Sequence, residues 1–168
     1  QSLYGEFLRP GSLAFDLGSH LGNRIPVWRR LGAEVVALEP NPACFRYLEG
    51  RYGGKAGIRL LPAAVGERSG QAELHIDSRY PTLATLSSEW MDEVSQTEAF
   101  RKIDWDSTVH VEVTTLESLA DTYGMPDFCK IDVEGYEAEV LSSLSRPLPA
   151  LSFEYLPQST ERAERCLD

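Results

Sequence analysis

Asp16, Gly18 and Gly22 have types and spacing suited to holding a small ligand. They follow the apolar segment Leu13-Ala14-Phe15, which has the character of a buried strand. Gly18 permits a sharp turn because it has no Cβ, and Gly22 lets the start of the next helix approach a ligand closely. The free N–H groups of the first helical turn point toward that ligand. This pattern predicts a small-molecule crevice at the end of the strand.

A second carboxylate, Glu39, ends the next apolar run. Val35 to Leu38 are continuously apolar, as is typical of a strand covered on both faces. A carboxylate at the tip of the neighbouring strand can accept hydrogen bonds from both hydroxyl groups of a ribose. The N-terminal part of the chain therefore predicts a site for a nucleoside that carries a further group over a helix N-terminus.

Alternating strand and helix patterns would position these residues. We expect strands over residues 13–15, 35–38, 58–61, 128–132 and 150–155, and helices over 25–31, 42–52, 116–123, 136–144 and 161–167. Asn41 is a suitable N-cap for the second of these helices. The alternation predicts one α/β domain over residues 1–168, with a Rossmann-like, doubly wound and mostly parallel sheet.

The segment from about residue 68 to 115 departs from this alternation. Residues 71–76 and 108–113 alternate polar and apolar side chains, which predicts antiparallel strands with one solvated face. Residues 77–107 between them show no clear period and are expected to form a long loop. Loops of this length usually serve as lids or substrate walls, and a partly disordered insertion is the alternative.

Charge and cysteine content exclude several classes of protein. The net charge of −10, with 16 Lys and Arg residues, disfavours a nucleic-acid partner, since phosphates are bound mainly by basic side chains. Cys44, Cys129 and Cys166 form no C-x-x-C pair, so neither zinc ligation nor a disulfide framework is indicated. Because an N-terminal signal and a long apolar run are also absent, we expect a cytoplasmic protein with no membrane association.

Three blocks of residues together resemble the FkbM family of S-adenosylmethionine-dependent methyltransferases, which have the class I methyltransferase fold. The resemblance runs from about Gly11 to Tyr155, and residues 62–66 also match. The first block alone is weak, because many nucleotide-binding folds have a glycine-rich first turn. The three blocks in this order and spacing are specific, and they are residues 15–22, 37–42 and 130–137.

The resemblance implies S-adenosylmethionine as cofactor. Gly18 and Gly22 would form the loop beneath its methionine part, and Glu39 would bind its ribose. The full set of implied cofactor-binding residues is Asp16, Gly18, Ser19, His20, Gly22, Asn23, Glu39, Pro40, Asn41, Ala64 and Asp132. Because the family generally methylates hydroxyl oxygens of small molecules, including sugars and polyketide-like scaffolds, we expect a small-molecule hydroxyl acceptor.

The chain departs from the family pattern in two places. The family usually has Asn at the position of His20, so a possible base replaces a neutral group. Its fold also has the strand order 3-2-1-4-5-7-6, and the last two strands have no counterpart in this sequence. We therefore expect strand 150–155 to be an exposed edge, unless the chain has been shortened or a partner, such as a second copy in a homodimer, covers it.

His20, Asp132 and Glu134 are the candidate catalytic residues. The imidazole of His20 titrates near neutrality and lies in the cofactor loop, although a neutral hydrogen bond to the ligand is the alternative. Glu134 and Glu137 flank the turn where the acceptor should approach, or they complement a helix dipole. Glu154 is a further candidate for substrate contact. Asp132, Glu134 and Glu154 could bind Mg²⁺, but a metal is not indicated, since such sites usually have more closely spaced carboxylates or a substrate chelate.

Two other functions remain open from the sequence. A nicotinamide-dependent oxidoreductase would also use a ribose-binding carboxylate, but it requires G-x-G-x-x-G to seat a pyrophosphate. Here the spacing is Gly18-x-x-x-Gly22, and His20 occupies the position of the second glycine. The other alternative is a binding module that kept the methyltransferase fold without catalysis.

Overall fold

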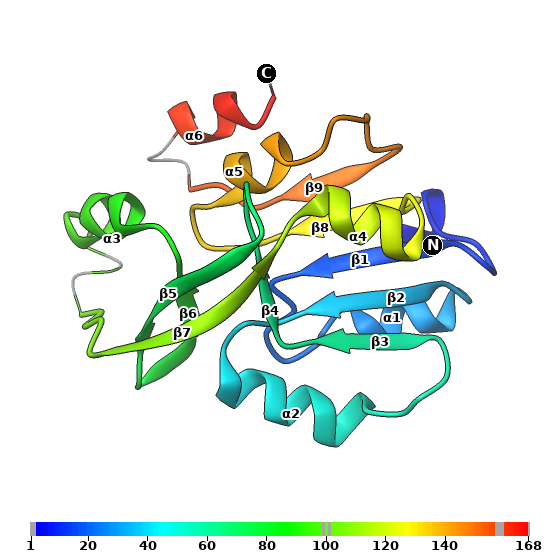
Figure 1. Cartoon of the computed structure of the whole chain (residues 1–168), viewed down its shortest axis with the longest axis horizontal. Helices are drawn as coiled ribbons and strands as arrows, with labels where there is room; N and C mark the ends of the chain where they lie inside the picture. The colour runs from blue at the N-terminus through cyan, green and yellow to red at the C-terminus, as the bar shows by residue number, and fades with distance from the viewer. Residues whose placement is uncertain (1–2, 99, 101, 157–159, 168) are drawn as a thin grey trace.

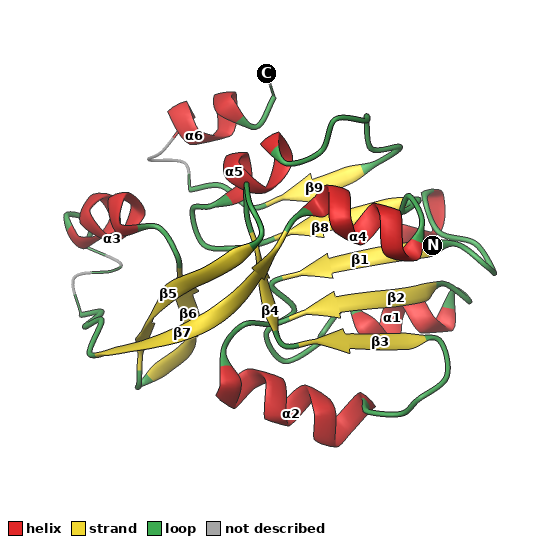
Figure 2. Cartoon of the chain, viewed as in Figure 1, coloured by secondary structure: helices red, strands yellow, loops and turns green. Residues whose placement is uncertain are grey.

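A parallel five-stranded sheet forms the centre of the fold (Figure 1 and Figure 2). The structure is a computed structural model that describes residues 3–98, 100, 102–156 and 160–167. The strands stand in the order β3-β2-β1-β8-β9, and every pairing is parallel. Their bounds are Leu13–Leu17 (β1), Glu34–Leu38 (β2), Ile58–Leu61 (β3), Phe128–Ile131 (β8) and Leu151–Phe153 (β9). All five expected strands are therefore present, and β9 lies at one edge.

Helices cover both faces of this sheet, as the doubly wound prediction requires. Successive side chains on a strand point to opposite faces, so Ala14 packs with Trp28 on one face and Phe15 with Leu116 on the other. The helices around this sheet are η1 (Leu3–Glu6, a 3-10 turn), α1 (Ile25–Arg30), α2 (Pro42–Tyr52), α4 (Leu116–Tyr123), α5 (Glu137–Ser142) and α6 (Thr160–Arg165).

The strand register brings the predicted functional residues together. Asp16 pairs with Ala37 of β2 on one side and with Lys130 of β8 on the other. Because the strands are parallel, the loops that follow β1, β2 and β8 leave the sheet at the same end. These loops carry the glycine turn, Glu39 and Asp132.

A second sheet of four strands lies beside the end of the first (Figure 1). Its order is β4-β7-β5-β6, with bounds Ala63–Val65 (β4), Gly70–Asp77 (β5), Tyr80–Thr85 (β6) and Ser107–Thr114 (β7). The expected antiparallel pairing of β5 with β7 is confirmed, whereas β4 pairs with β7 in parallel. These strands form a separate mixed sheet instead of extending the parallel one. The chain passes from one sheet to the other at Pro62, between β3 and β4.

The prediction of a loop without regular structure over residues 77–107 was wrong. This segment contains β6 and the helix α3 (Ser88–Ser95). The Ser87 side chain caps α3 by accepting a hydrogen bond from the Trp90 amide at 3.1 Å, and Trp90 and Val94, four residues apart, are both buried. The helix is only two turns long, so its apolar spacing is too short to stand out in the sequence.

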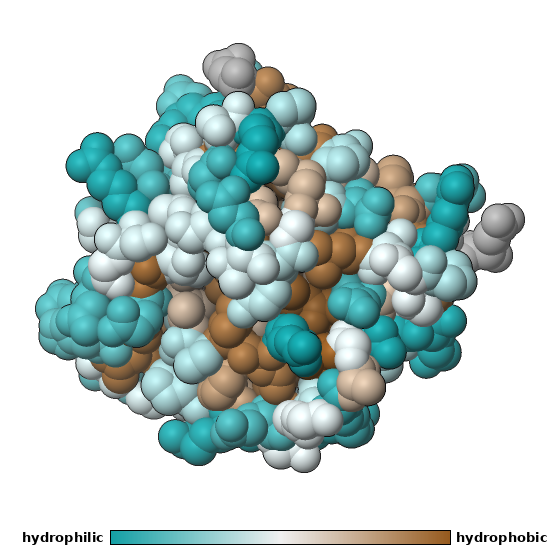
Figure 3. All heavy atoms as spheres, turned by 45° about the vertical axis from the view of Figure 1, so that its right-hand side comes forward, coloured by the Kyte–Doolittle hydropathy of each residue, from teal (hydrophilic) through white to brown (hydrophobic). Residues whose placement is uncertain are grey.

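The surface shows one further feature of the packing. In the space-filling view, hydrophobic residues gather in a hollow at the centre of the visible face, with hydrophilic residues around it (Figure 3). Among the residues that the structure describes, no helix combines the length and the apolar character needed to cross a membrane.

Candidate functional site

The glycine turn after β1 is held by backbone contacts that only glycine permits. Gly18 has a φ of 72°, and a Cβ at this position would overlap the carbonyl oxygen of Asp132. The amides of Gly18 and Ser19 both donate to the carbonyl oxygen of Leu38, at 3.1 and 2.9 Å. The Ser19 hydroxyl donates to the carbonyl oxygen of Asp16 at 2.7 Å. Gly18 and Ser19 thus join the ends of β1, β2 and β8 into one rigid rim.

Gly22 has a different neighbour from the one that its place in the sequence suggests. A Cβ on Gly22 would lie 2.7 Å from Leu48 Cδ2 and 2.8 Å from a ring carbon of Tyr52. The Tyr52 hydroxyl also donates to the Gly22 carbonyl oxygen at 3.3 Å. The glycine is therefore needed for close packing of the loop against α2. A direct contact of Gly22 with a ligand stays a prediction, as does one of the neighbouring Asn23, whose side chain is exposed.

Glu39 is a buried carboxylate with both oxygens oriented by backbone amides. Oε2 accepts a hydrogen bond from the His20 amide at 2.7 Å, and Oε1 accepts one from the Asn41 amide at 2.9 Å. Burial raises the pKa of Glu39 to about 7, although these two hydrogen bonds oppose the increase. Each oxygen keeps a further lone pair that could accept a hydroxyl hydrogen bond.

Asn41 serves the architecture in the way the sequence indicates. It is the N-cap of α2, and its side-chain oxygen accepts a hydrogen bond from the Ala43 amide at 2.9 Å. The cap fixes where α2 begins relative to Glu39, two residues earlier. A contact between Asn41 and the cofactor stays a prediction.

Lys130 connects the two carboxylates at the ends of β1 and β8. Its Nζ lies 3.4 Å from Asp16 Oδ1 and 3.0 Å from Asp132 Oδ2, and it donates to the Gly18 carbonyl oxygen at 2.7 Å. Burial alone would lower the pKa of Lys130, but the two carboxylates outweigh it and raise the pKa. The sequence analysis missed this residue. The signal was a lone charge inside the apolar strand 128–131.

The two carboxylates next to Lys130 keep free hydrogen-bonding capacity. Asp16 is fully buried, and neither of its oxygens accepts a hydrogen bond from any residue that the structure describes. The same holds for Oδ1 of Asp132. Burial raises the pKa of Asp16, with Lys130 opposing it. For Asp132 burial acts in the same direction, but Lys130 and the other neighbouring groups prevail and lower the pKa.

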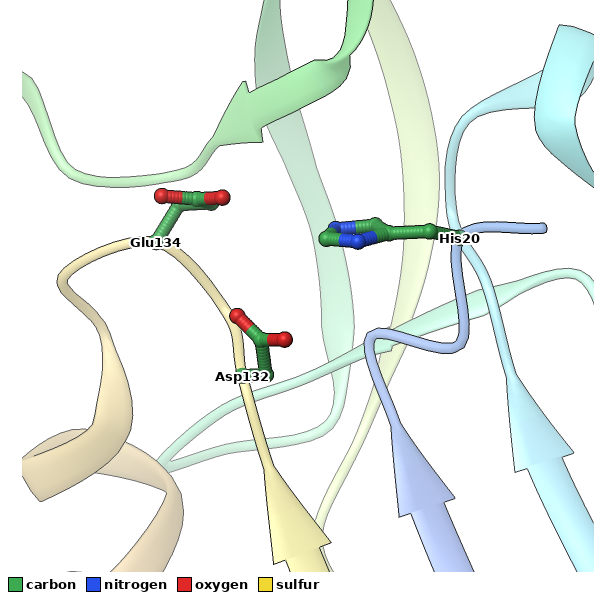
Figure 4. A group of neighbouring side chains, drawn as sticks. All are labelled: His20, Asp132 and Glu134. Atoms are coloured by element: carbon green, nitrogen blue, oxygen red, sulfur yellow. The ribbon is translucent and has the colours of Figure 1, made fainter. Parts of the chain in front are cut away.

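The three predicted catalytic residues lie together. One nitrogen of His20 and one carboxylate oxygen each of Asp132 and Glu134 lie within 4.8 Å of one another. Figure 4 shows the side chains turned toward a common space, His20 from the loop after β1 and the other two from the loop after β8. Burial lowers the pKa of His20, which favours a neutral imidazole, and raises the pKa of Glu134 to about 8 with help from nearby carboxylates.

Two further glutamates stand close to this group. The pKa of Glu154 is raised to about 7, first because its side chain contacts Asp132 and second because it is partly buried. Glu137 is buried, and its Oε1 accepts hydrogen bonds from the amides of Val133 and Gly135, at 3.0 and 3.3 Å. Glu137 thus orders the turn before α5, in line with the structural alternative for this residue. Glu154 stays available to a ligand.

The loop after β8 contributes to two cavities, through Asp132 to the first and through Glu134 to the second. The first encloses about 440 Å³, including space open to solvent, and is lined by Gly18, His20, Glu39, Pro40, Ala63, Ala64, Val65, Leu74, Ala84, Leu86, Asp132, Val133 and Tyr136. The second encloses about 610 Å³ on the same basis and is lined by Leu83, Trp90, Phe100, Glu134, Gly135, Glu137, Phe153, Glu154, Tyr155, Leu156, Arg162, Ala163 and Cys166.

The second cavity is walled by the segment that the sequence left without structure. The Trp90 ring of α3 lies against Gly135, where a Cβ would overlap it. Thr85 Oγ1 at the end of β6 donates to the Glu134 carbonyl oxygen at 2.6 Å. Arg162 of α6 donates to the Gly135 carbonyl oxygen at 3.0 Å and to Glu93 of α3 at 2.8 Å. These contacts fix the wall to the turn that carries Glu134.

Comparison with known proteins agrees with this geometry. The chain matches the family model described as the methyltransferase FkbM domain over residues 16–163. Its structure is similar to the crystal structure of precorrin-6y C5,15-methyltransferase from Geobacter metallireducens GS-15, with a TM-score of 0.52 and 13% sequence identity. That similarity covers 98% of this chain and 65% of the other chain, and it shows a shared fold. No curated protein sequence matched this chain. Since the family model spans most of the chain, the protein belongs to the FkbM methyltransferase family.

Proposed function

We propose that this protein transfers a methyl group from S-adenosylmethionine to a hydroxyl oxygen of a small molecule. The observation that carries the proposal is the buried Glu39 at the end of β2, beside the Gly18 turn. The amides of His20 and Asn41 hold its two oxygens in place. A carboxylate fixed in this position is suited to accept both hydroxyl hydrogen bonds of a ribose.

The residues at the end of β1 suit the other end of the same cofactor. Neither oxygen of Asp16 accepts a hydrogen bond from the described residues, and Lys130 Nζ lies 3.4 Å from Oδ1 alone. Such buried acceptors are costly unless a donor reaches them, and an ammonium group of an amino-acid moiety supplies one. Glu39 and Asp16 belong to neighbouring strands, so they would hold the ribose and the methionine part in one crevice.

When bound, S-adenosylmethionine supplies a methyl group on a cationic sulfur. In the transfer an O–C bond forms while the C–S bond breaks, the sulfur leaves as a neutral thioether, and the hydroxyl proton passes to a base. Carboxylates pressed against the sulfur would stabilise the ground state more than the transition state. Asp16 and Glu39 should therefore contact the edges of the cofactor. The protein accelerates the reaction mainly by holding the acceptor oxygen about 3–3.5 Å from the methyl group and in line with it.

The cluster of His20, Asp132 and Glu134 lies where the hydroxyl proton would be removed. Because burial favours the neutral imidazole, His20 has a lone pair available to accept the proton near neutral pH. The raised pKa of Glu134, about 8, means that this side chain holds a proton at the same pH. In the absence of another bound group, His20 is the better base of the two.

The second cavity suits the methyl acceptor. Aromatic and aliphatic side chains make up most of its wall, and Glu134 and Glu154 add carboxyl groups at the border with the first cavity. Carboxyl groups can accept hydrogen bonds from hydroxyl groups, and aromatic rings can cover an apolar face. We infer that the acceptor has a hydroxyl group on a largely apolar body.

Calorimetric titration with S-adenosylhomocysteine and with NAD⁺ tests this function. We expect micromolar binding of S-adenosylhomocysteine and none of NAD⁺. Glu39→Gln should weaken binding by roughly ten- to a hundredfold, since it removes a charge-assisted acceptor. Glu34→Gln is the matched control, because Glu34 begins the same strand and is exposed. Failure of S-adenosylhomocysteine to bind would favour a non-catalytic module, and binding of NAD⁺ alone would favour the oxidoreductase.

A further inference from the structure

The convergence of His20, Asp132 and Glu134 has the form of a cation site. The three side chains offer one nitrogen and two carboxylate oxygens, all within 4.8 Å of one another. The ligand atoms around a bound divalent transition metal lie roughly 3–4 Å apart, because each metal–ligand bond is about 2.0–2.2 Å long. Small side-chain rotations would bring the three atoms to that separation. Figure 4 shows that all three side chains point into the same space.

The backbone holds two of these ligands in unusual conformations. Among the described residues, the non-glycine residues with positive φ are His20 and Glu134, at 49° and 52°. This conformation is unfavourable for residues with a Cβ and persists where the surroundings enforce it. The amide of His20 is fixed by Glu39, and the carbonyl oxygen of Glu134 is fixed by Thr85. Backbone hydrogen bonds therefore fix the positions from which the His20 and Glu134 side chains extend.

Carboxyl groups outnumber cationic groups around this cluster. Glu134 feels the carboxylates of Asp132, Glu154 and Glu137. Lys130 is the cation on the Asp132 side, but it contacts Oδ2 and is shared with Asp16. Arg162 at the far end of the turn is bound to Glu93 and to a carbonyl oxygen. Oδ1 of Asp132 is buried and accepts no hydrogen bond from the described residues. A cation would satisfy this oxygen and reduce the repulsion among the carboxylates.

We propose that His20, Asp132 and Glu134 bind a divalent first-row transition metal between the two cavities. The donor set indicates the type of ion, because imidazole with carboxylates suits Mn²⁺, Fe²⁺ or Zn²⁺, whereas Ca²⁺ and Mg²⁺ prefer oxygen ligands alone. Three protein ligands leave positions open for other molecules. His20 and Asp132 line the first cavity and Glu134 lines the second, so those positions face both.

A metal in this position would bind the acceptor hydroxyl in the proposed reaction. A hydroxyl group bound to a divalent cation loses its proton more readily, and that proton would pass to solvent in place of the ligated His20. This catalytic role rests on the proposed function. The binding of the ion does not, and it can be measured in the absence of any cofactor or acceptor.

Titration with MnCl₂ tests the site. The chain without an affinity tag is titrated, and free Mn²⁺ is followed by electron paramagnetic resonance. We expect one Mn²⁺ bound per chain at submillimolar concentration. His20→Asn and Glu134→Gln should each weaken binding at least about tenfold. Asn tolerates positive φ, so the first variant keeps the backbone. His110→Asn is the control, since His110 lies 3.8 Å from Glu73 in an exposed pair on β5 and β7.

Three results would overturn the site: no binding of Mn²⁺ to the unchanged chain, unchanged affinity in both ligand variants, or an equal loss in His110→Asn. Circular dichroism of each variant without metal establishes folding, and Asp132→Asn replaces a variant that fails to fold. Titration with S-adenosylhomocysteine is run separately on the metal-free chain. Mn²⁺ binding without S-adenosylhomocysteine binding would retain the metal site and reject the proposed function, and the converse would reject the metal site alone.

Discussion

Lys130 and Asp16 form a buried ion pair across β8 and β1, with Nζ 3.4 Å from Oδ1. The two residues are also register partners, so the pair lies at the centre of the parallel sheet. Asp132 Oδ2 lies 3.0 Å from the same ammonium group. One lysine is therefore shared by two carboxylates of the proposed cofactor site.

Removing the charge of Lys130 should destabilise the fold strongly. Lys130→Met leaves Asp16 buried without its counterion, which should lower the free energy of unfolding by about 3–5 kcal/mol. Adding Asp16→Asn should recover part of this loss, because the unpaired charge disappears. Urea denaturation measures both effects, with the exposed Lys102→Met as control. A loss in Lys130→Met no larger than in Lys102→Met would contradict the pair.

Gly18 is required for two reasons, its positive φ and the lack of space for a Cβ, and two variants can separate their effects on stability. Gly18 and Gly54 have φ values of 72° and 70°, but only at Gly18 would a Cβ meet other atoms. Gly54→Ala should cost about 1–2 kcal/mol for the left-handed conformation alone. Gly18→Ala should cost more than about 4 kcal/mol or prevent folding, since the Asp132 carbonyl oxygen cannot move away. Equal melting temperatures for the two variants would show that the turn does not touch β8 as described.

The hydroxyl of Thr85 links the wall of the second cavity to the turn that carries Glu134. It donates to the Glu134 carbonyl oxygen at 2.6 Å and accepts from the Ser87 amide at 2.9 Å. Thr85→Val keeps the shape but leaves both groups unpaired, which should cost about 1–3 kcal/mol. Thr108→Val makes the same change on the exposed face of β7 and should be nearly neutral. Thermal unfolding compares the two variants. Equal stabilities would show that the Thr85 hydroxyl does not make these hydrogen bonds.

Asp77 should make the second sheet sensitive to acid. Its carboxylate accepts hydrogen bonds from Arg79 Nη2 at 2.9 Å and from the Asp104 amide at 2.8 Å. The hydrogen bonds from Arg79 make the largest contribution, and together these contacts lower the pKa of Asp77 well below its ordinary value of 3.8. The folded state thus binds this proton more weakly than the unfolded state. The stabilisation should be complete above about pH 5 and should be lost as the pH falls below about 4.

Urea unfolding of Asp77→Asn at several pH values tests that assignment. The variant should be less stable than the unchanged chain at pH 6. The difference should narrow toward pH 3, because the unfolded chain binds a proton at Asp77 in this range and the folded chain does not. A difference that stays constant over this range would mean that Asp77 acts through its shape and not through its charge.

Local patterns were sufficient to predict most of the main sheet. The helix 116–123 was predicted with the bounds observed for α4, because its cap and apolar spacing lie within the segment itself. In contrast, α3 depends on burial of Trp90 against Gly135, a residue distant in the sequence. Strand β4 has three residues and pairs with β7, far along the chain, so its own sequence carries little signal.

The candidate site residues could be predicted where a carboxylate directly follows the end of a predicted strand. Glu39 and Asp132 follow strand ends, and the structure places both beside the glycine turn. The packing of Gly22 against Leu48 and Tyr52 was not predicted, because the sequence does not show which side chains of α2 face the loop. Lys130 was missed because a lysine within an apolar strand becomes meaningful only when the register places Asp16 opposite.

The segment from Gly66 to Thr114 begins and ends at neighbouring points of the domain. The amide of Gly66 donates to the carbonyl oxygen of Thr114 at 3.0 Å, so the chain leaves and rejoins the domain at neighbouring points. The segment between them adds Leu83, Trp90 and Phe100 to the wall of the second cavity, and Leu74, Ala84 and Leu86 to the wall of the first. Under the proposed function, grafting this segment between homologues should therefore change both acceptor selectivity and cofactor affinity.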